Sequence, residues 1–189
     1  MISKNYQRKH LRAPFKEPVL FADGEHVLKA RAINISEGGL LLDEIPSFPE
    51  LDDVSMLLSL PQLPSLKNFT LIKMQTFSRE LFPSRVIRLQ GRMVRREQLS
   101  RDLNNLFKAR IGIQFTNLNE QDLRYIEEYV TTFSSNLIHL QTLIDSFNTD
   151  DETKHKVRTL AKVLGYSDTE KISQLRSVVT HDYKSLQWL

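Results

Sequence analysis

The clearest strand pattern in the chain is Phe107-Lys108-Ala109-Arg110-Ile111-Gly112-Ile113-Gln114-Phe115. Its odd-numbered residues are apolar, and its even-numbered residues are charged, polar or glycine. Because successive side chains of a β-strand point to opposite faces, this alternation predicts a strand with one buried face. Segments of similar character lie upstream, so we expect the sequence from Val19 to Phe115 to be mainly strands.

Four upstream segments have the composition of strands: residues 28–32, 38–42, 54–60 and 86–96. Several short strands separated by turn residues predict a small antiparallel barrel or sandwich. The interval 61–83 begins and ends with proline and has no clear period. We expect it to be a long loop, or a loop that contains its own hairpin.

After Phe115 the spacing of apolar residues changes from two to alternating steps of three and four. Asn119 is the expected N-cap of a helix. The apolar positions of this helix form a heptad seam: Leu123, Ile126, Val130, Phe133, Leu137, Leu140, Ile144 and Phe147. A helix of about 28 residues is roughly 40 Å long. A small barrel cannot cover that length, so the far part needs a second copy of the chain or the helices that follow.

The remaining tail is expected to be helical. A helix is predicted to begin at 150–151 and to end at Gly165, which fits the C′ position. Residues 167–170 have the form of a capping box that opens a last helix. The chain closes with Trp188 and Leu189, which we expect to be docked rather than exposed.

Composition excludes several classes of function. The 189 residues include no cysteine, so disulfides, thiolate metal sites and a cysteine nucleophile are ruled out. No apolar run approaches the roughly 18 residues of a membrane span, and no secretory signal is recognisable, so we expect a cytoplasmic protein. The five histidines lack metal-like spacing, and no catalytic triad, carboxylate pair or phosphate loop is present. We therefore predict no catalytic residue, no metal and no cofactor.

The charges are unevenly distributed, although the net charge is only +3. Basic residues cluster in 4–16 and in 85–101, and acidic residues cluster in 43–53. Two basic clusters favour an anionic ligand if the fold brings them together, but a solvated surface explains each cluster as well. The arginines at 88, 92 and 96 are expected to share one strand face, as a solvated rim or as part of the pocket.

Two short motifs carry the functional prediction. The first is Arg8-x-x-x-Arg12, which lies just before a proline, and the second is Asn34-x-Ser36-x-x-Gly39. Each motif alone is common, but their order resembles the PilZ family, the bacterial receptors of the second messenger cyclic di-GMP (c-di-GMP). The strand-like segments 34–42 and 111–115 resemble the same family.

The resemblance covers about residues 5–130 and implies the fold. We expect a mainly β protein with a six- or seven-stranded antiparallel barrel of the PilZ type and a C-terminal α-helical extension. The expected parts are an N-terminal arm (1–17), the barrel (18–118), the long helix (119–148) and a helical extension (149–189).

The resemblance also implies the ligand site. Arg8 and Arg12 would clamp c-di-GMP, and Asn34, Ser36 and Gly39 would form its floor. Guanidinium groups suit this task because they fork onto guanine edges or phosphate oxygens. The amide and the hydroxyl are two residues apart and would share a face of an extended strand. The glycine would leave room for backbone to approach the ligand, or supply a positive φ.

The expected function is that of an effector or adapter that couples c-di-GMP binding to a conformational change and to a downstream protein partner. The helix Leu123–Phe147 offers a seam for a homodimer. Two alternatives stay open: a PilZ-like scaffold that works through protein partners without the nucleotide, and a nucleic-acid-binding barrel. The strand segments show no interleaved surface aromatics, so we do not expect nucleic acid as the partner.

Overall fold

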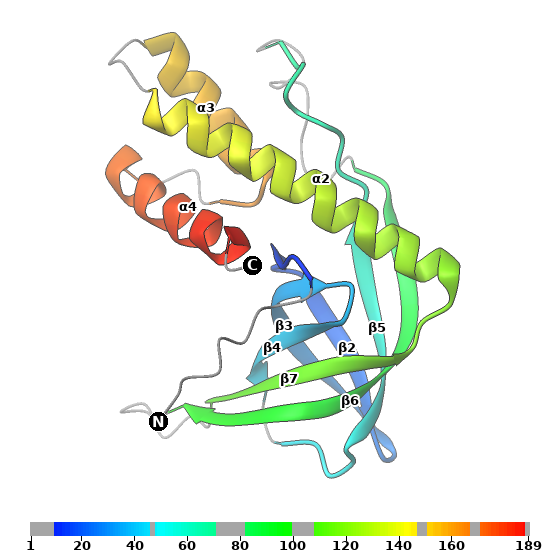
Figure 1. Ribbon diagram of the computed structural model, residues 1–189. Coiled ribbons are helices and arrows are strands. Elements are labelled where there is room, and N and C mark those ends of the chain that lie inside the picture. Colours follow the sequence, from blue (N-terminus) through cyan, green and yellow to red (C-terminus); the bar gives the residue numbers. More distant parts are fainter. Residues whose placement is uncertain are drawn as a thin grey trace, which may run out of the picture. The chain divides into compact units, whose positions relative to one another are not determined.

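The computed structural model describes residues 10–45, 48–70, 82–99, 108–146, 151–166 and 171–187. They fall into two compact units, whose strands and helices are shown in Figure 1. The barrel unit comprises residues 12–62 and 84–130, and the helical unit contains the rest of the described chain.

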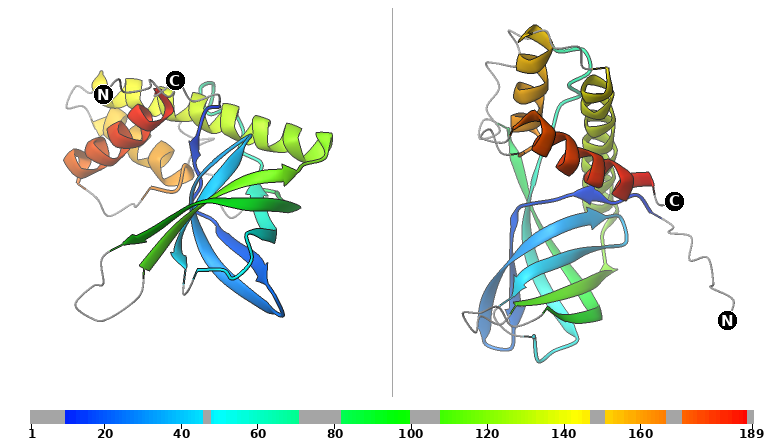
Figure 2. Two further views of the ribbon diagram at one scale, coloured as in Figure 1. Left: turned by 60° about the horizontal axis from the view of Figure 1, so that its bottom comes forward. Right: turned by 90° about the vertical axis from the view of Figure 1, so that its left-hand side faces the viewer.

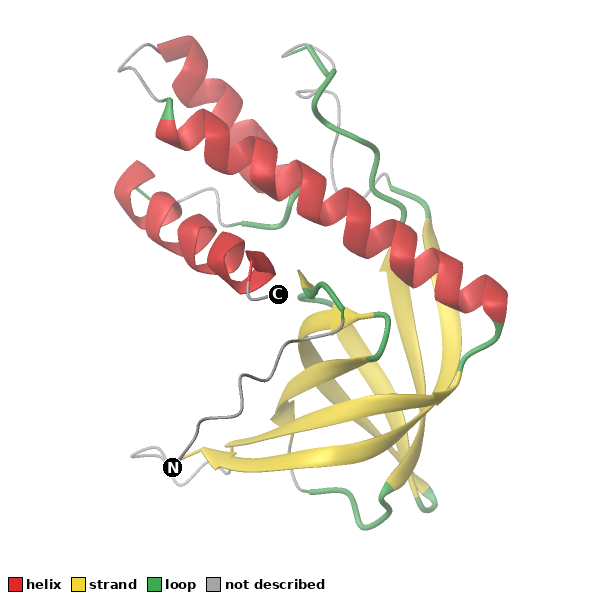
Figure 3. Cartoon of the chain, in the orientation of Figure 1, coloured by secondary structure: helices red, strands yellow, loops and turns green. Residues whose placement is uncertain are grey.

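The barrel unit is an antiparallel sheet that closes on itself (Figures 2 and 3). Its strands in the described chain are β1 (Ala13–Pro14), β2 (Pro18–Asp23), β3 (His26–Ser36), β4 (Gly39–Ile45), β5 (Asp53–Pro61), β6 (Ser84–Leu99) and β7 (Lys108–Asn117). The order is β1-β3-β2-β5-β6-β7-β4, and β4 also pairs with β3. Six strands therefore form a closed barrel, and β1 is an extra strand on β3. The predicted antiparallel barrel is confirmed.

Alternating apolar residues fill the barrel interior, as the strand patterns predict. In β7, Ala109, Ile111 and Ile113 are buried. Phe115 is only partly buried, and Phe107 lies outside the described residues. Alternate residues of β5 are likewise buried: Val54, Met56, Leu58 and Leu60. Because the sheet closes, each of the six barrel strands has a neighbour on both sides. Few backbone N–H and C=O groups around the core are therefore left without a partner strand.

Helix α2 (Glu120–Asp145) begins where the sequence predicts. The Asn119 side chain accepts a hydrogen bond from the backbone N–H of Asp122 at 2.8 Å, which is the N-cap interaction. Residues up to Val130 belong to the barrel unit. There the Tyr129 hydroxyl donates to the carbonyl of Pro14 at 2.8 Å, so α2 holds β1 directly.

The rest of α2 belongs to the helical unit with α3 (Asp151–Val163) and α4 (Ile172–Gln187), so the predicted helical extension is confirmed. Arg176 of α4 donates to the carbonyl of Ile144 near the end of α2. Six residues of the heptad seam are buried within the single chain: Ile126, Val130, Phe133, Leu137, Leu140 and Ile144. Helix α3 and the turn after it bury the face predicted for them: Val157, Leu160, Ala161 and Leu164.

The end of α3 also matches its prediction. Gly165 has a φ of 84°, in the left-handed region that favours glycine. Its N–H donates to the carbonyl of Lys162, and the N–H of Tyr166 donates to the carbonyl of Ala161. These two bonds form a Schellman motif, which satisfies the last carbonyls of the helix.

Part of the segment expected as a loop is held against α2. Asn136, which is fully buried, accepts from the backbone N–H of Leu66 at 2.8 Å and donates to the carbonyl of Pro64 at 2.9 Å. One buried amide therefore fixes residues 64–66 through their backbone. The described residues 62–70 contain no strand.

Several sequence predictions fall outside the described residues. These are the last seam residue, Phe147, the capping box at 167–170, and the terminal Trp188 and Leu189. Within the described residues, every helix is too short or too polar to span a bilayer.

Candidate functional site

The second sequence motif lies at the end of β3 and the start of β4, just after a β-bulge. Ala32 pairs with Leu42, but Asn34 pairs with Leu41, so Ile33 is the extra residue of β3. A shift of one residue changes the face on which the following side chains lie. This local irregularity sets the orientation of the motif.

Beyond the bulge, Ile35 is fully buried in the barrel core. Asn34 and Ser36 are the alternate positions, and β3 continues through Ser36, so these two residues share the opposite, outer face. Asn34 is partly exposed, and no hydrogen bond of its side chain is found among the described residues. Its amide therefore has donors and an acceptor available to a ligand.

The Ser36 hydroxyl is already engaged in the turn. It donates to the carbonyl of Gly39 at 3.1 Å, and Ser36 is only 6% exposed. The hydroxyl proton is used in this hydrogen bond, but the Ser36 oxygen can still accept a hydrogen bond from another group. In this state Ser36 suits an N–H donor, such as a guanine edge, better than a phosphate oxygen, which offers no proton.

Gly39 does not have the positive φ that was one of the two reasons expected for a glycine at this position. The other expected role, room for backbone to approach the ligand, stays a prediction. A Cβ at this position would lie 2.1 Å from the backbone oxygen of Ile113 on β7, which is far inside contact distance. In the described chain, positive φ among glycines occurs at Gly24 and Gly165 and not at Gly39. The residue is therefore required by the close approach of β4 and β7.

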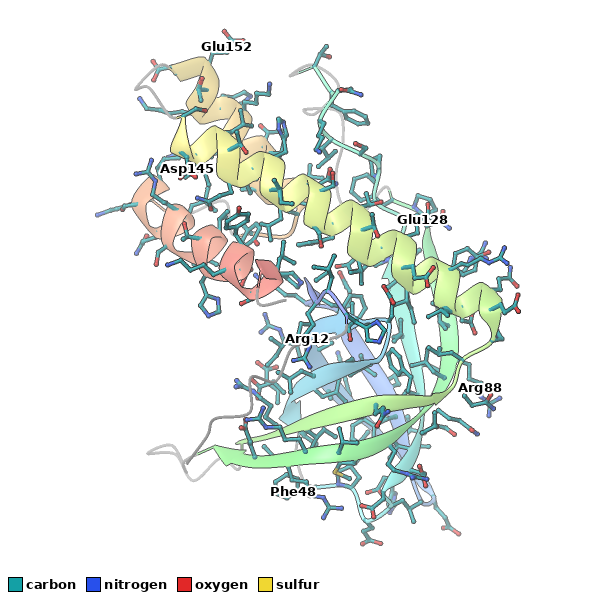
Figure 4. The ribbon with its side chains drawn as sticks, in the orientation of Figure 1. Arg12, Phe48, Arg88, Glu128, Asp145 and Glu152 are labelled. Carbon is teal, nitrogen blue, oxygen red and sulfur yellow. The ribbon has the colours of Figure 1, made fainter. Side chains whose placement is uncertain are left out.

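The first motif reaches the same region through β1. Ala13 pairs with Ile35, and Pro14 pairs with Asn34. Continued by one residue, this antiparallel register brings the backbone of Arg12 level with Ser36. Arg12 is exposed, and Figure 4 labels its side chain.

Four of the five predicted site residues are therefore brought together by β1, β3 and β4: Arg12, Asn34, Ser36 and Gly39. The fifth, Arg8, lies outside the described residues. The described part of the candidate site thus combines one guanidinium, one amide and one hydroxyl oxygen at the edge of the barrel.

The packing of α2 fixes the position of β1. The rings of Phe15 and Tyr129 meet edge to face, with centroids 5.5 Å apart, and Phe15 is fully buried. The N–H of Phe15 also donates to the carbonyl of Ile33, the bulge residue. The chain directly after Arg12 is thus held by both the sheet and α2.

The basic strand β6 differs from its prediction at one arginine. Arg92 donates to Asp53 at 3.1 Å. A second bulge between Met93 and Arg95 shifts the pairing with β7, so that Arg96 is opposite the core residue Ile111. The expectation that the arginines at 88, 92 and 96 share one face is therefore wrong at position 96.

Arg95 takes the outer position that the sequence pattern assigned to Arg96. It forms an ion pair with Glu97, and its side chain is 66% exposed. Arg96 instead pairs with Asp52 at 2.7 Å. A plain alternation gives no sign of a bulge, and only the excess of arginines in 85–101 could have pointed to Arg95.

Paired charges cover the neighbouring part of β3, β4 and β7. Arg110 donates to Asp43 at 3.1 Å, and Arg31 pairs with Glu44 at 3.3 Å. These pairs neutralise one another at the surface, so they contribute little to attracting an anion. Within the described residues, no group of three His, Asp or Glu is arranged to hold a metal ion.

Solved structures with similar folds include three bacterial proteins. The inhibitor of motility MotI/DgrA of Bacillus subtilis is 15% identical, with a TM-score of 0.47 over 66% of this chain and 49% of that chain. The PilZ domain of YcgR from Escherichia coli with c-di-GMP is 16% identical, with a TM-score of 0.40 over 72% of this chain and 96% of that one. The PlzA protein of Borreliella burgdorferi in complex with c-di-GMP is 12% identical, with a TM-score of 0.41 over 77% of this chain and 56% of that chain.

The chain spans about half the length of the Bacillus protein that it matches. No curated protein matches it. The family model of the PilZ domain matches residues 6–132. That match covers more than half of the chain and includes both sequence motifs, the barrel strands and the first turns of α2. The chain belongs to the PilZ domain family.

Proposed function

We propose that the protein is a c-di-GMP receptor whose ligand binds on the outer face of the barrel, at the junction of β1, β3 and β4. The observation that carries the proposal is the pairing of β1 with β3, with Pro14 opposite Asn34. Through it the end of the first motif meets the second, although Arg12 and Asn34 are 22 residues apart in the sequence (34 minus 12). Both are the motifs by which the chain resembles the nucleotide receptors of its family.

Each residue has a distinct chemical task in this proposal. The guanidinium groups of Arg8 and Arg12 fork onto a guanine edge or onto phosphate oxygens. The Asn34 amide offers both donors and an acceptor, and the Ser36 oxygen accepts from a ring N–H. Gly39 contributes by keeping β4 close to β7, which holds the other residues in place.

Signal output is the second part of the proposal. Closure of the N-terminal arm over the ligand would change the surface that a downstream protein contacts, and the ligand shifts that equilibrium only as far as it prefers the closed form. A homodimer through Leu123–Phe147 would have to use the helix face opposite the seam, because the described seam residues from Ile126 onward are buried in one chain. Away from the seam, Ile138 is 45% exposed.

Calorimetric titration tests the receptor function. We expect wild-type protein to bind c-di-GMP, and Arg12→Ala and Asn34→Ala to weaken binding by about 10- to 100-fold, as expected for loss of hydrogen bonds to a charged ligand. Arg88→Ala is the matched control, since Arg88 is an exposed arginine of the barrel that pairs with Leu57, away from the motifs. Absence of binding by wild-type protein with a normal unfolding transition would refute the proposal.

A further inference from the structure

The outer face of the barrel continues from the proposed site across further strands. One register row joins Asn34 on β3, Leu41 on β4, Gly112 on β7 and Arg95 on β6. Hydrogen-bonded strands are about 4.8 Å apart, so the row spans roughly 14 Å. Arg95 therefore stands at the far end of a continuous surface that begins at Asn34.

This surface has little side-chain cover in its middle. We name it the outer shelf and define it as Gly39 and Leu41 of β4 with Gly112 and Gln114 of β7. Two of the four positions are glycines on neighbouring strands, and both are partly exposed. A Cβ at Gly112 would lie 3.2 Å from the Cβ of Arg95, so the glycine also makes room for that side chain. The surface between the two polar ends is thus formed by the β7 backbone beside Gly39 and by the Arg95 side chain beside Gly112, and neither glycine adds a side chain that would block a flat ring system.

Arg95 is less firmly held than the neighbouring arginine of its strand. Two nitrogens of Arg92 donate to the two oxygens of Asp53 on another strand, β5. The ion pair of Arg95 is with Glu97, two residues along its own strand, and the Arg95 side chain is 66% exposed. An exposed ion pair of this kind contributes little to stability, so Arg95 can readily leave Glu97 and donate to another hydrogen-bond acceptor.

We propose that Arg95 is a further ligand-contacting residue, which binds the half of c-di-GMP that extends over the outer shelf away from Arg12. This inference rests on the proposed function. The ligand has a guanine on each side of its phosphate ring, so a base held near Arg12 leaves a second base to be recognised. The Arg95 guanidinium leaves Glu97 and forks onto the O6 and N7 edge of that base or onto a phosphate.

The test is titration of c-di-GMP into four variants of the full chain, beside wild-type protein and the Arg12→Ala variant of the receptor test. Arg95→Ala is expected to weaken binding about tenfold, a modest loss for a charged hydrogen bond. Arg95→Lys keeps the charge but loses the fork, so it should recover only part of the affinity. Glu97→Gln removes the competing carboxylate and should strengthen binding. Arg88→Ala, the same charge loss on the same strand, should stay within about twofold of wild type.

The outcomes separate this inference from the receptor function. If Arg12→Ala loses binding but Arg95→Ala does not, Arg95 is outside the site and the receptor function stands. If Arg88→Ala and Arg95→Ala weaken binding equally, the loss of affinity comes from long-range electrostatic attraction and not from a contact with Arg95. The inference is then overturned. If folded wild-type protein does not bind at all, the proposed function fails and this inference fails with it. Thermal unfolding of each variant shows whether its barrel is intact.

Discussion

Gly39 and Gly24 both lie at hairpins of the barrel, yet they are needed for different physical reasons. Gly24, in the turn between β2 and β3, has a φ of 59° and nothing within 4 Å of where a Cβ would be. Its requirement is conformational, and an alanine there would strain the backbone without a clash. Gly39 has the opposite problem, because a Cβ would meet the backbone oxygen of Ile113 at 2.1 Å.

Gly39→Ala is therefore expected to be the more damaging substitution. The backbone of β7 cannot move aside as a flexible side chain would, so β4 and β7 must separate, at a cost of about 3 kcal/mol. Gly24→Ala should cost about 1 kcal/mol, the strain of one left-handed residue. Urea unfolding of both variants measures the difference. Equal losses of stability would show that β4 and β7 do not approach as closely as described.

Strand β1 is short, and a single helix residue helps to hold it. It is only two residues long, and it pairs with Ile35 and Asn34. Tyr129 adds a hydrogen bond to the carbonyl of Pro14 and an edge-to-face contact with Phe15. Tyr129 is thus a positioning residue: through Pro14 and Phe15 it holds the segment that directly follows Arg12.

Tyr129→Phe separates these two contacts. The ring and its packing remain, but the Pro14 carbonyl loses its donor, so we expect a loss of about 1–2 kcal/mol in the free energy of unfolding. Binding of c-di-GMP should weaken by a few-fold, because Arg12 is then less well fixed beside Ser36. Hydrogen exchange at the Phe15 amide reports the loosening of β1. Faster exchange there with unchanged affinity would show that β1 does not position the ligand residues.

The predicted elements that the structure confirms share one property: their signal is local and periodic. The strand predicted at 107–115, the Asn119 cap and the Gly165 helix end each depend on neighbours within a few residues, and the described chain contains all three. The barrel followed from the number of such strands, together with the family resemblance. The meeting of Arg12 with Asn34 came from the resemblance alone, since no local pattern specifies that β1 pairs with β3.

The bulges could not be predicted, and they decide which side chains face the candidate site. Register shifts occur in β3 before Asn34, in β4 after Leu42, and in β6 before Arg95. A bulge adds one residue to a strand without changing the strand's composition. A prediction that rests on alternating apolar and polar residues therefore does not detect it. For this reason the sequence pattern assigned the outer position of β6 to Arg96 instead of Arg95.

Helix α2 contributes to both units of the chain, and its second part carries a histidine in an environment that disfavours the charged form. Burial lowers the pKa of His139 from its ordinary value of 6.5, and the charges of Lys156 and Lys67 lower it further. The Nε2 atom of His139 is buried and has no hydrogen-bond partner among the described residues. The folded protein therefore favours the neutral imidazole.

The consequence is a loss of stability in mild acid. Below pH 6.5 the unfolded chain takes up a proton at this histidine more readily than the folded chain does, so the free energy of unfolding falls as the pH falls. Well above pH 6.5 both states are neutral there, and the contribution is constant. His139→Gln should flatten the pH dependence of thermal unfolding below pH 6.5. His155→Gln, the same substitution at an exposed position of α3, is the matched control for the loss of a histidine elsewhere in the chain. If the thermal stability of His139→Gln falls with decreasing pH as steeply as that of wild type, other groups cause the loss of stability in acid.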